Sequence, residues 1–169
     1  TDARNIGTIN ATVGNAAIAA DASVNNSGTV KAGTNASITA GTSATNTAAM
    51  TAGMNATITA VDAITNSGAM TATNGYATIT STNGNVVNAA TGTMTAGTYA
   101  RITADQDITN NAAIAANGGD ASISSTKGSI ENTASVYAVD YVSLSALDDI
   151  TNSGSLTAGT SASITAGEA

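Results

Sequence analysis

The chain has 169 residues, with four Lys or Arg against eleven Asp or Glu, which gives a formal net charge of −7 at pH 7. It contains no Cys, His, Pro, Trp or Phe and only four Tyr. Without His and Cys, the usual catalytic triads and zinc sites are excluded. The negative charge argues against nucleic acid or an anionic membrane as a partner. A core almost without aromatic rings is typical of a narrow solenoid rather than of a globular domain.

An asparagine recurs along the whole chain at intervals of 21, 20, 20, 22, 22, 22 and 20 residues. These eight residues are Asn5, Asn26, Asn46, Asn66, Asn88, Asn110, Asn132 and Asn152. A period of this length over the full sequence indicates one structural unit that is copied about eight times.

Each copy contains three short segments in which every second residue is apolar, small or Asn. The first segment has a mostly aliphatic residue two positions before the Asn, as in 64–66, and the second has an aliphatic residue two positions before an Ala, as in 70–72. The third segment follows an Ala with a large aliphatic residue, and this third column consists of Ile18, Ile38, Ile58, Ile79, Ile102, Ile123, Leu144 and Ile164. Alternation with a period of two predicts β-strands, and the Gly, Asn and Asp between the segments predict turns.

Three strands that recur in constant register every 20–22 residues predict an all-β parallel β-helix, a β-solenoid of about eight coils. At about 4.8 Å per coil, the rod would be about 40 Å long. Equivalent residues then lie above one another, so the asparagines are expected to form an inward ladder of hydrogen-bonded amides. Without such partners, each buried amide would cost about 1–3 kcal/mol.

Residues 1–169 are predicted to form a single domain, and both ends of the sequence stop in mid-pattern without a visible cap. Joining residue 169 to residue 1 would place Asn152 and Asn5 22 residues apart, which is a spacing found within the chain. Because bare end coils expose unpaired strand edges, two interpretations stay open. The chain is a segment of a longer repeat array, or it is a subunit that stacks head to tail into an extracellular filament.

Residues 64–72 and 150–167 resemble the repeats of filamentous haemagglutinin-type exoproteins, and the resemblance extends over essentially the whole chain. Those proteins are large bacterial surface adhesins exported by two-partner secretion. The resemblance implies a right-handed β-helix that serves as a secreted, extracellular shaft, with flanking repeats and host-surface or matrix glycans or proteins as partners. It supplies no catalytic residue and no cofactor. The sequence departs from the family in two respects: the amino-terminal secretion domain is missing, and the Gly-Gly-Asp turn common in the repeats occurs once, at 118–120.

Two surface features are candidate ligand sites. Outward hydroxyl pairs flank the third column, among them Thr57, Thr59, Thr78 and Thr80. Such a flat array resembles the surface of β-helical ice-binding proteins, which gives ice binding as an alternative function. Arg101 interrupts the array, however, and Thr is common on solvated strands in any case.

Three tyrosines, Tyr76, Tyr99 and Tyr141, share a position three residues before the third column. Adjacent rings at a corner of the solenoid could bind a sugar. Mutual stacking of Tyr76 and Tyr99 would explain their presence equally well.

Carboxylates occur in pairs at 105/107 and 148/149, where acid–base chemistry or calcium binding would need them. The copy between them carries Lys127-Gly128-Ser129 instead, so turn solubility explains the pairs better. We therefore expect no catalytic residue, no metal and no cofactor. A membrane span is not expected, because the sequence has no apolar run of about 20 residues.

Overall fold

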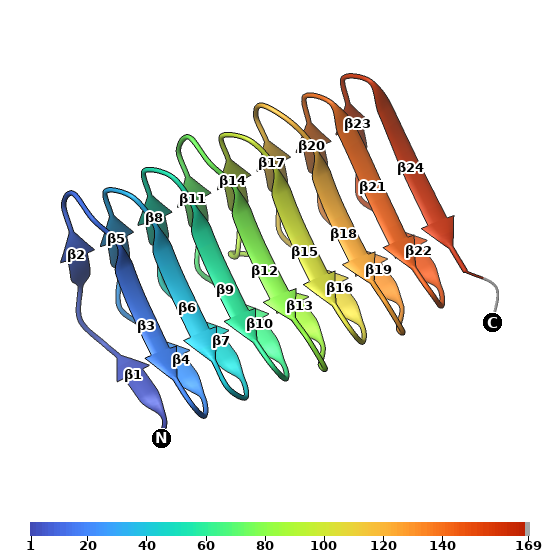
Figure 1. Ribbon diagram of the computed structural model, residues 1–169. Coiled ribbons are helices and arrows are strands. Elements are labelled where there is room, and N and C mark those ends of the chain that lie inside the picture. The colour runs from blue at the N-terminus through green and yellow to red at the C-terminus, as the bar shows by residue number, and fades with distance from the viewer. Residues whose placement is uncertain (168–169) are drawn as a thin grey trace.

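The computed structural model of the chain describes residues 1–167 and confirms a parallel β-solenoid with three strands in each of eight coils. Equivalent strands of successive coils pair in parallel, so that the coils build three sheets of eight strands each. Figure 1 shows the coils side by side in sequence order, with the N-terminus at one end of the stack and the C-terminus at the other.

The first sheet consists of β1 (Ala3–Asn5), β4 (Val24–Asn26), β7 (Ala44–Asn46), β10 (Ile64–Asn66), β13 (Val86–Asn88), β16 (Ile108–Asn110), β19 (Ile130–Asn132) and β22 (Ile150–Asn152). The second consists of β2 (Ile9–Ala11), β5 (Val30–Ala32), β8 (Met50–Ala52), β11 (Met70–Ala72), β14 (Met94–Ala96), β17 (Ile114–Ala116), β20 (Val136–Ala138) and β23 (Leu156–Ala158). The third consists of β3 (Ala16–Ala20), β6 (Ala36–Ala40), β9 (Ala56–Ala60), β12 (Ala77–Ser81), β15 (Ala100–Ala104), β18 (Ala121–Ser125), β21 (Tyr141–Ala146) and β24 (Ser161–Ala166).

Differences in repeat length are confined to the corners between strands. In the short coil that begins with β4, three-residue corners at 27–29, 33–35 and 41–43 join the strands, and the next coil has corners of the same length. Longer coils keep the same strands and add residues only at the corners 12–15, 73–76, 82–85, 89–93, 117–120 and 126–129. The longest of these corners is the five-residue corner 89–93 of the fifth coil. Because insertions never enter a strand, every sheet keeps its register from coil to coil.

The core is a narrow channel filled by the inward residues of the three sheets. Aliphatic side chains of the middle coils, such as Ile58, Met70 and Ile79, are at most 1% exposed. Small Ala side chains occupy most other inward positions, which leaves no space for rings. In the first and last coils the side chains of the same columns are more exposed. Ile164, for example, pairs in register with Leu144 but is 50% exposed.

Candidate functional site

The inward asparagines form a continuous ladder, as the sequence predicts. Each Asn ends the first strand of its coil, and the Nδ2 of every one except Asn152 donates to the Oδ1 of the Asn in the next coil over 2.6–2.9 Å. The six Asn between the end coils are fully buried. Since no buried side-chain nitrogen or oxygen of residues 1–167 lacks a partner, these amides avoid the desolvation cost of unpaired groups.

All bonds of the ladder run in one direction. The nitrogen always points toward the C-terminal end of the stack and the oxygen toward the N-terminal end. At the N-terminal end, Oδ1 of Asn5 accepts only a long bond from the N–H of Gly7, at 3.3 Å. At the other end, Nδ2 of Asn152 turns to the carbonyl of Gly154, at 3.0 Å. The ladder is therefore polar along the whole rod.

A second, shorter asparagine ladder lies at the corner before the third strand. Nδ2 of Asn35 donates to Oδ1 of Asn15 and Nδ2 of Asn55 to Oδ1 of Asn35, each over 3.0 Å. The same oxygens also accept backbone N–H groups of the following coil, and Oδ1 of Asn55 accepts the N–H of Tyr76 at 3.1 Å. These three residues share one column of the repeat, and their hydrogen bonds were not predicted. Their constant spacing of 20 residues was the available signal.

At the corner before the first strand, side-chain oxygens of Asn, Asp and Ser likewise accept backbone N–H groups of the following coil. Oδ1 of Asn85 accepts the N–H of Asp107, Oδ1 of Asp107 accepts the N–H of Ser129, and Oγ of Ser129 accepts the N–H of Asp149. In the first coils, Oδ1 of Asp2 accepts the N–H of Ser23 in this way. In the predicted pair 105/107, the carboxylate of Asp107 therefore serves as a structural acceptor between coils, whereas Asp149 of the pair 148/149 takes part through its backbone N–H.

Two buried serines close the four-residue corners that follow the third strand. Oγ of Ser81 accepts the N–H of Gly84 and donates to the carbonyl of Asp62, and Ser125 makes the same bonds with Gly128 and Gln106. The equivalent residue is Ala in the six other coils, whose described corners are shorter by one residue. Ser in this column thus accompanies the extra corner residue, a correlation that could have been found in the sequence.

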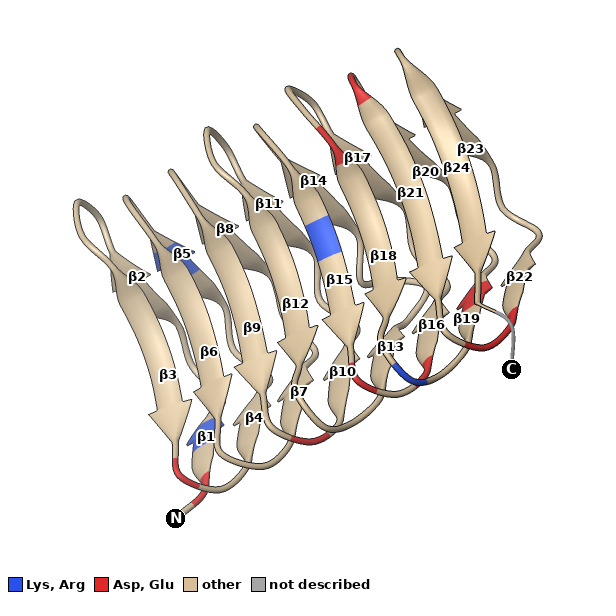
Figure 2. Cartoon of the chain, turned by 45° about the vertical axis from the view of Figure 1, so that its right-hand side comes forward, with Lys and Arg blue, Asp and Glu red and all other residues tan. Residues whose placement is uncertain are grey.

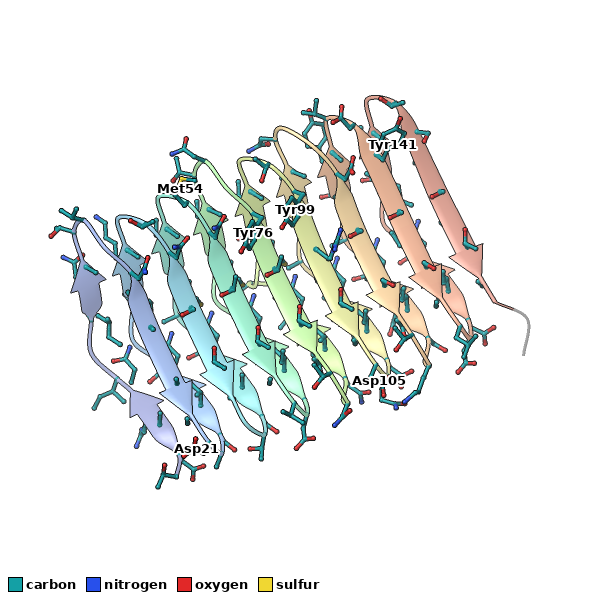
Figure 3. All side chains as sticks on the ribbon, in the orientation of Figure 1. Asp21, Met54, Tyr76, Tyr99, Asp105 and Tyr141 are labelled. Atoms are coloured by element: carbon teal, nitrogen blue, oxygen red, sulfur yellow. The ribbon has the colours of Figure 1, made fainter. Side chains whose placement is uncertain are left out.

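The rings of Tyr76 and Tyr99 stack on neighbouring coils, with centroids 5.0 Å apart and planes 11° from parallel. The guanidinium carbon of Arg101 lies 5.6 Å from the centre of the Tyr99 ring. Tyr141 lies on a later coil at the same edge of the stack and is half-exposed (Figure 3). Asp120 occupies the column between Tyr99 and Tyr141, and its Oδ1 accepts the N–H of Tyr141. Of the three predicted tyrosines, the structure therefore brings Tyr76 and Tyr99 into contact. Because each ring covers one face of the other, only the opposite face of each remains for a sugar.

The predicted hydroxyl array lies on the outer face of the third sheet. Thr57 pairs in register with Thr78, and Thr59 with Thr80. The next strand replaces the first of these rows with the exposed Arg101, whose Nε donates to Oγ of Ser122 at 3.2 Å. Because the Arg101 side chain projects from this face and bonds to Ser122, the regular Thr array is limited to the coils that precede Arg101.

Most acidic residues lie along the corner that joins each coil to the next (Figure 2). They are Asp2, Asp21, Asp62, Asp105, Asp107, Asp148 and Asp149. Nζ of Lys127 lies 3.0 Å from Oδ2 of Asp105, one coil away. The hydrogen bond from Lys127, together with one from Thr126, lowers the pKa of Asp105. This ion pair was not predicted, although its separation of 22 residues equals one coil.

Within residues 1–167, no three His, Cys, Asp or Glu side chains are grouped so that they could hold a metal ion. A shallow surface hollow of about 200 Å³ lies between the widened corners, lined mostly by Thr methyl and hydroxyl groups and by Asp105. The carboxylate of Asp105 is already bonded to Lys127, Thr126 and Gln106.

Comparison of the chain with models of protein families, with curated proteins and with solved structures found no match. Residues 1–167 include no helix with the length and apolar character to cross a membrane.

Proposed function

We propose that the chain is a non-catalytic structural shaft, a stiff rod that works outside a bacterial cell in adhesion or in contact between cells and matrix. The observation that supports this role is the uninterrupted stack of eight coils, in which three sheets and the Asn ladder run from one end to the other. Each coil bonds to its neighbours along all three walls, so bending the rod would break many hydrogen bonds at once.

The side-chain chemistry fits the same role. The titratable side chains that form bonds, such as Asp105, Asp107 and Asp120, hold one coil to the next. The outward positions of the strands are occupied mainly by Thr and Ser. Secretion and the surface of a bacterium are part of the proposal, which takes them from the resemblance to haemagglutinin-type repeats.

A pulling experiment would test the shaft. The chain is placed between a surface anchor and a domain of known ligand, and force is applied through a ligand-coated bead. Because the coils are joined along three walls, the rod should transmit force without lengthening until it unfolds. A flexible Gly/Ser linker in its place should lengthen steadily from low force.

Two results would contradict the shaft proposal. One is steady lengthening of the chain at the low forces that extend the flexible linker. The other is capture, by the chain without the added domain, of beads coated with host-matrix proteins or glycans, because the binding function would then lie on the rod itself.

The register of Thr57 with Thr78 and of Thr59 with Thr80 supports ice binding as a second function. In this case the outer face of the third sheet would adsorb to ice. Thermal hysteresis of the purified chain would be the direct readout, and Thr78→Lys should remove it while Thr71→Lys on the second sheet should not. A freezing curve identical to that of the buffer would eliminate this alternative.

A further inference from the structure

We propose that Asn117 is a site of spontaneous modification, at which the folded chain converts its own side-chain amide into a carboxylate. Three Asn-Gly pairs occur in the sequence, at 74–75, 83–84 and 117–118, and each lies in a corner between two strands. Of these three pairs, the structure leaves only the third free to react. This modification is independent of the proposed shaft, because it alters one corner and none of the strands.

An Asn followed by Gly can cyclise, because Gly has no Cβ to hinder the approach of its nitrogen. The backbone nitrogen of the Gly attacks Cγ of the Asn, a new N–C bond forms, and the Cγ–Nδ2 bond breaks. The amide group leaves as ammonia with the proton that the Gly nitrogen gives up, and a succinimide ring remains. Water then opens the ring. Opening at Cγ gives aspartate, and opening at the main-chain carbonyl gives isoaspartate, whose main chain runs through the former side chain.

The pair 117–118 meets the requirements of this reaction. Asn117 and Gly118 are both exposed. Within residues 1–167, neither the side chain of Asn117 nor the N–H of Gly118 forms a hydrogen bond. The amide is therefore free to turn toward the nitrogen, and the nitrogen is free to lose its proton to water.

At 83–84 the attacking nitrogen is already engaged. The N–H of Gly84 donates to Oγ of the buried Ser81 at 3.0 Å, and the same Oγ donates to the carbonyl of Asp62. A nitrogen whose proton is held in this way attacks only after the bond has opened. The fold therefore slows the cyclisation of Asn83.

At 74–75 the departing amide is held and the attacking nitrogen is shielded. Nδ2 of Asn74 donates to the carbonyl of Gly53 in the preceding coil at 3.0 Å. Gly75 is buried, and its carbonyl accepts the N–H of Thr98 in the following coil at 2.9 Å. Because this corner is tied to both neighbouring coils, cyclisation of Asn74 also requires local opening.

The corner 117–120 can accept the product without a change of register. The N–H of Asn117 donates to the carbonyl of Ala96, and the carbonyl of Gly119 accepts the N–H of Asp140, so both sides of the reacting bond are anchored. Isoaspartate lengthens the main chain by one carbon atom, whereas equivalent corners of this chain already differ by a whole residue. Loops tolerate such changes better than strands do. We therefore expect β17 and β18 to stay paired while the corner gains a negative charge.

Peptide mapping of the aged wild-type protein tests the proposal. The folded chain is incubated for several weeks in mildly alkaline buffer, and mass spectrometry measures the fraction of amide lost at each Asn. Electron-transfer fragmentation distinguishes isoaspartate from aspartate. We expect Asn117 to convert about tenfold faster than Asn74 and Asn83, which react only from locally opened states. The matched control is the same chain unfolded in urea, in which the three asparagines should convert at similar rates.

The variant Ser81→Ala tests the physical cause of the difference. It frees the N–H of Gly84, so Asn83 should convert about fivefold faster than in the wild-type protein, as expected for the loss of one hydrogen bond. Asn74 should keep its rate. Circular dichroism of the variant and of the aged wild-type protein shows whether each is folded.

Equal conversion of the three asparagines in the folded wild-type chain would overturn the proposal, since the fold would then not select among them. Retention of the Asn117 amide, over a time in which the unfolded chain has lost it, would have the same meaning. Loss of the β-type spectrum in step with the conversion of Asn117 would contradict the expected tolerance of the corner. An unchanged rate at Asn83 in folded Ser81→Ala would contradict the protection by the Ser81 hydroxyl.

Discussion

At the scale of single residues, the asparagines show how a polar side chain can be kept in a core of Ala and aliphatic residues. An amide has both a donor and an acceptor, so a column of amides can satisfy itself along the rod. Asn66, for example, accepts from Asn46, donates to Asn88 over 2.9 Å and also donates to the carbonyl of Gly92. Removing one member leaves a donor on one side and an acceptor on the other without their partners.

Replacing a middle member of the ladder should therefore destabilise the fold. We expect Asn66→Ala to lower the free energy of unfolding by about 1–3 kcal/mol, and Asn88→Ala and Asn110→Ala to behave alike. The outward Thr59→Ala should change it by no more than about 0.5 kcal/mol. Urea denaturation measures these values. Equal effects of Asn66→Ala and Thr59→Ala would show that the Asn side chains face the solvent.

The buried Ser81 gives a second residue-scale prediction. Its loss would leave the N–H of Gly84 and the carbonyl of Asp62 without the bonds that Oγ provides. We expect Ser81→Ala to lower the free energy of unfolding by about 1–2 kcal/mol. Ser145→Ala, an exposed position on the same sheet, is the control. If thermal denaturation gave the same midpoint for both variants, the corner would not depend on the hydroxyl.

At the scale of elements, strand positions could be predicted because each strand repeats the same alternation of inward and outward residues eight times. The corners could not be predicted in the same detail. Bonds such as Asn15–Asn35 and Lys127–Asp105 form between residues one coil apart, and they depend on how each corner bends. The stacking of Tyr76 on Tyr99 was foreseen, whereas the contact of Arg101 with the same ring was not.

The effect of a charged residue at an inward strand position should depend on whether its coil lies in the middle or at the end of the stack. Ile79 and Ile164 occupy the same column, but Ile79 is 0% exposed and Ile164 is 50% exposed. An unpaired carboxylate in the middle of the core would cost several kcal/mol, which is comparable with the whole stability of a domain. We expect Ile79→Asp and Ile102→Asp to prevent folding and Ile164→Asp to leave the β-type circular dichroism spectrum intact.

The spectrum of Ile164→Asp also serves as the internal control for this comparison. A folded Ile79→Asp protein with an unchanged melting temperature would contradict the placement of the third column in the core. Loss of folding in both variants would instead show that the last coil is as essential as the middle ones, against the exposure seen for it.

At the scale of the whole molecule, the rod is a one-dimensional assembly in which each coil touches only its neighbours. Its properties therefore follow from one repeated interface: three parallel pairings, the aliphatic columns and one link of the Asn ladder. The same interface carries the proposed shaft, which depends on the ladder being closed to water along its length.

Hydrogen exchange of the Asn side chains tests that dependence most directly. The protein is transferred to D₂O, and the side-chain NH₂ signals are followed by ¹⁵N-resolved NMR. The buried Asn46, Asn66 and Asn88 should exchange only when coils open, whereas the exposed Asn25 should exchange at once. If the ladder amides exchanged as fast as Asn25, they would be open to water, and the stacked, self-satisfied core described above would be wrong.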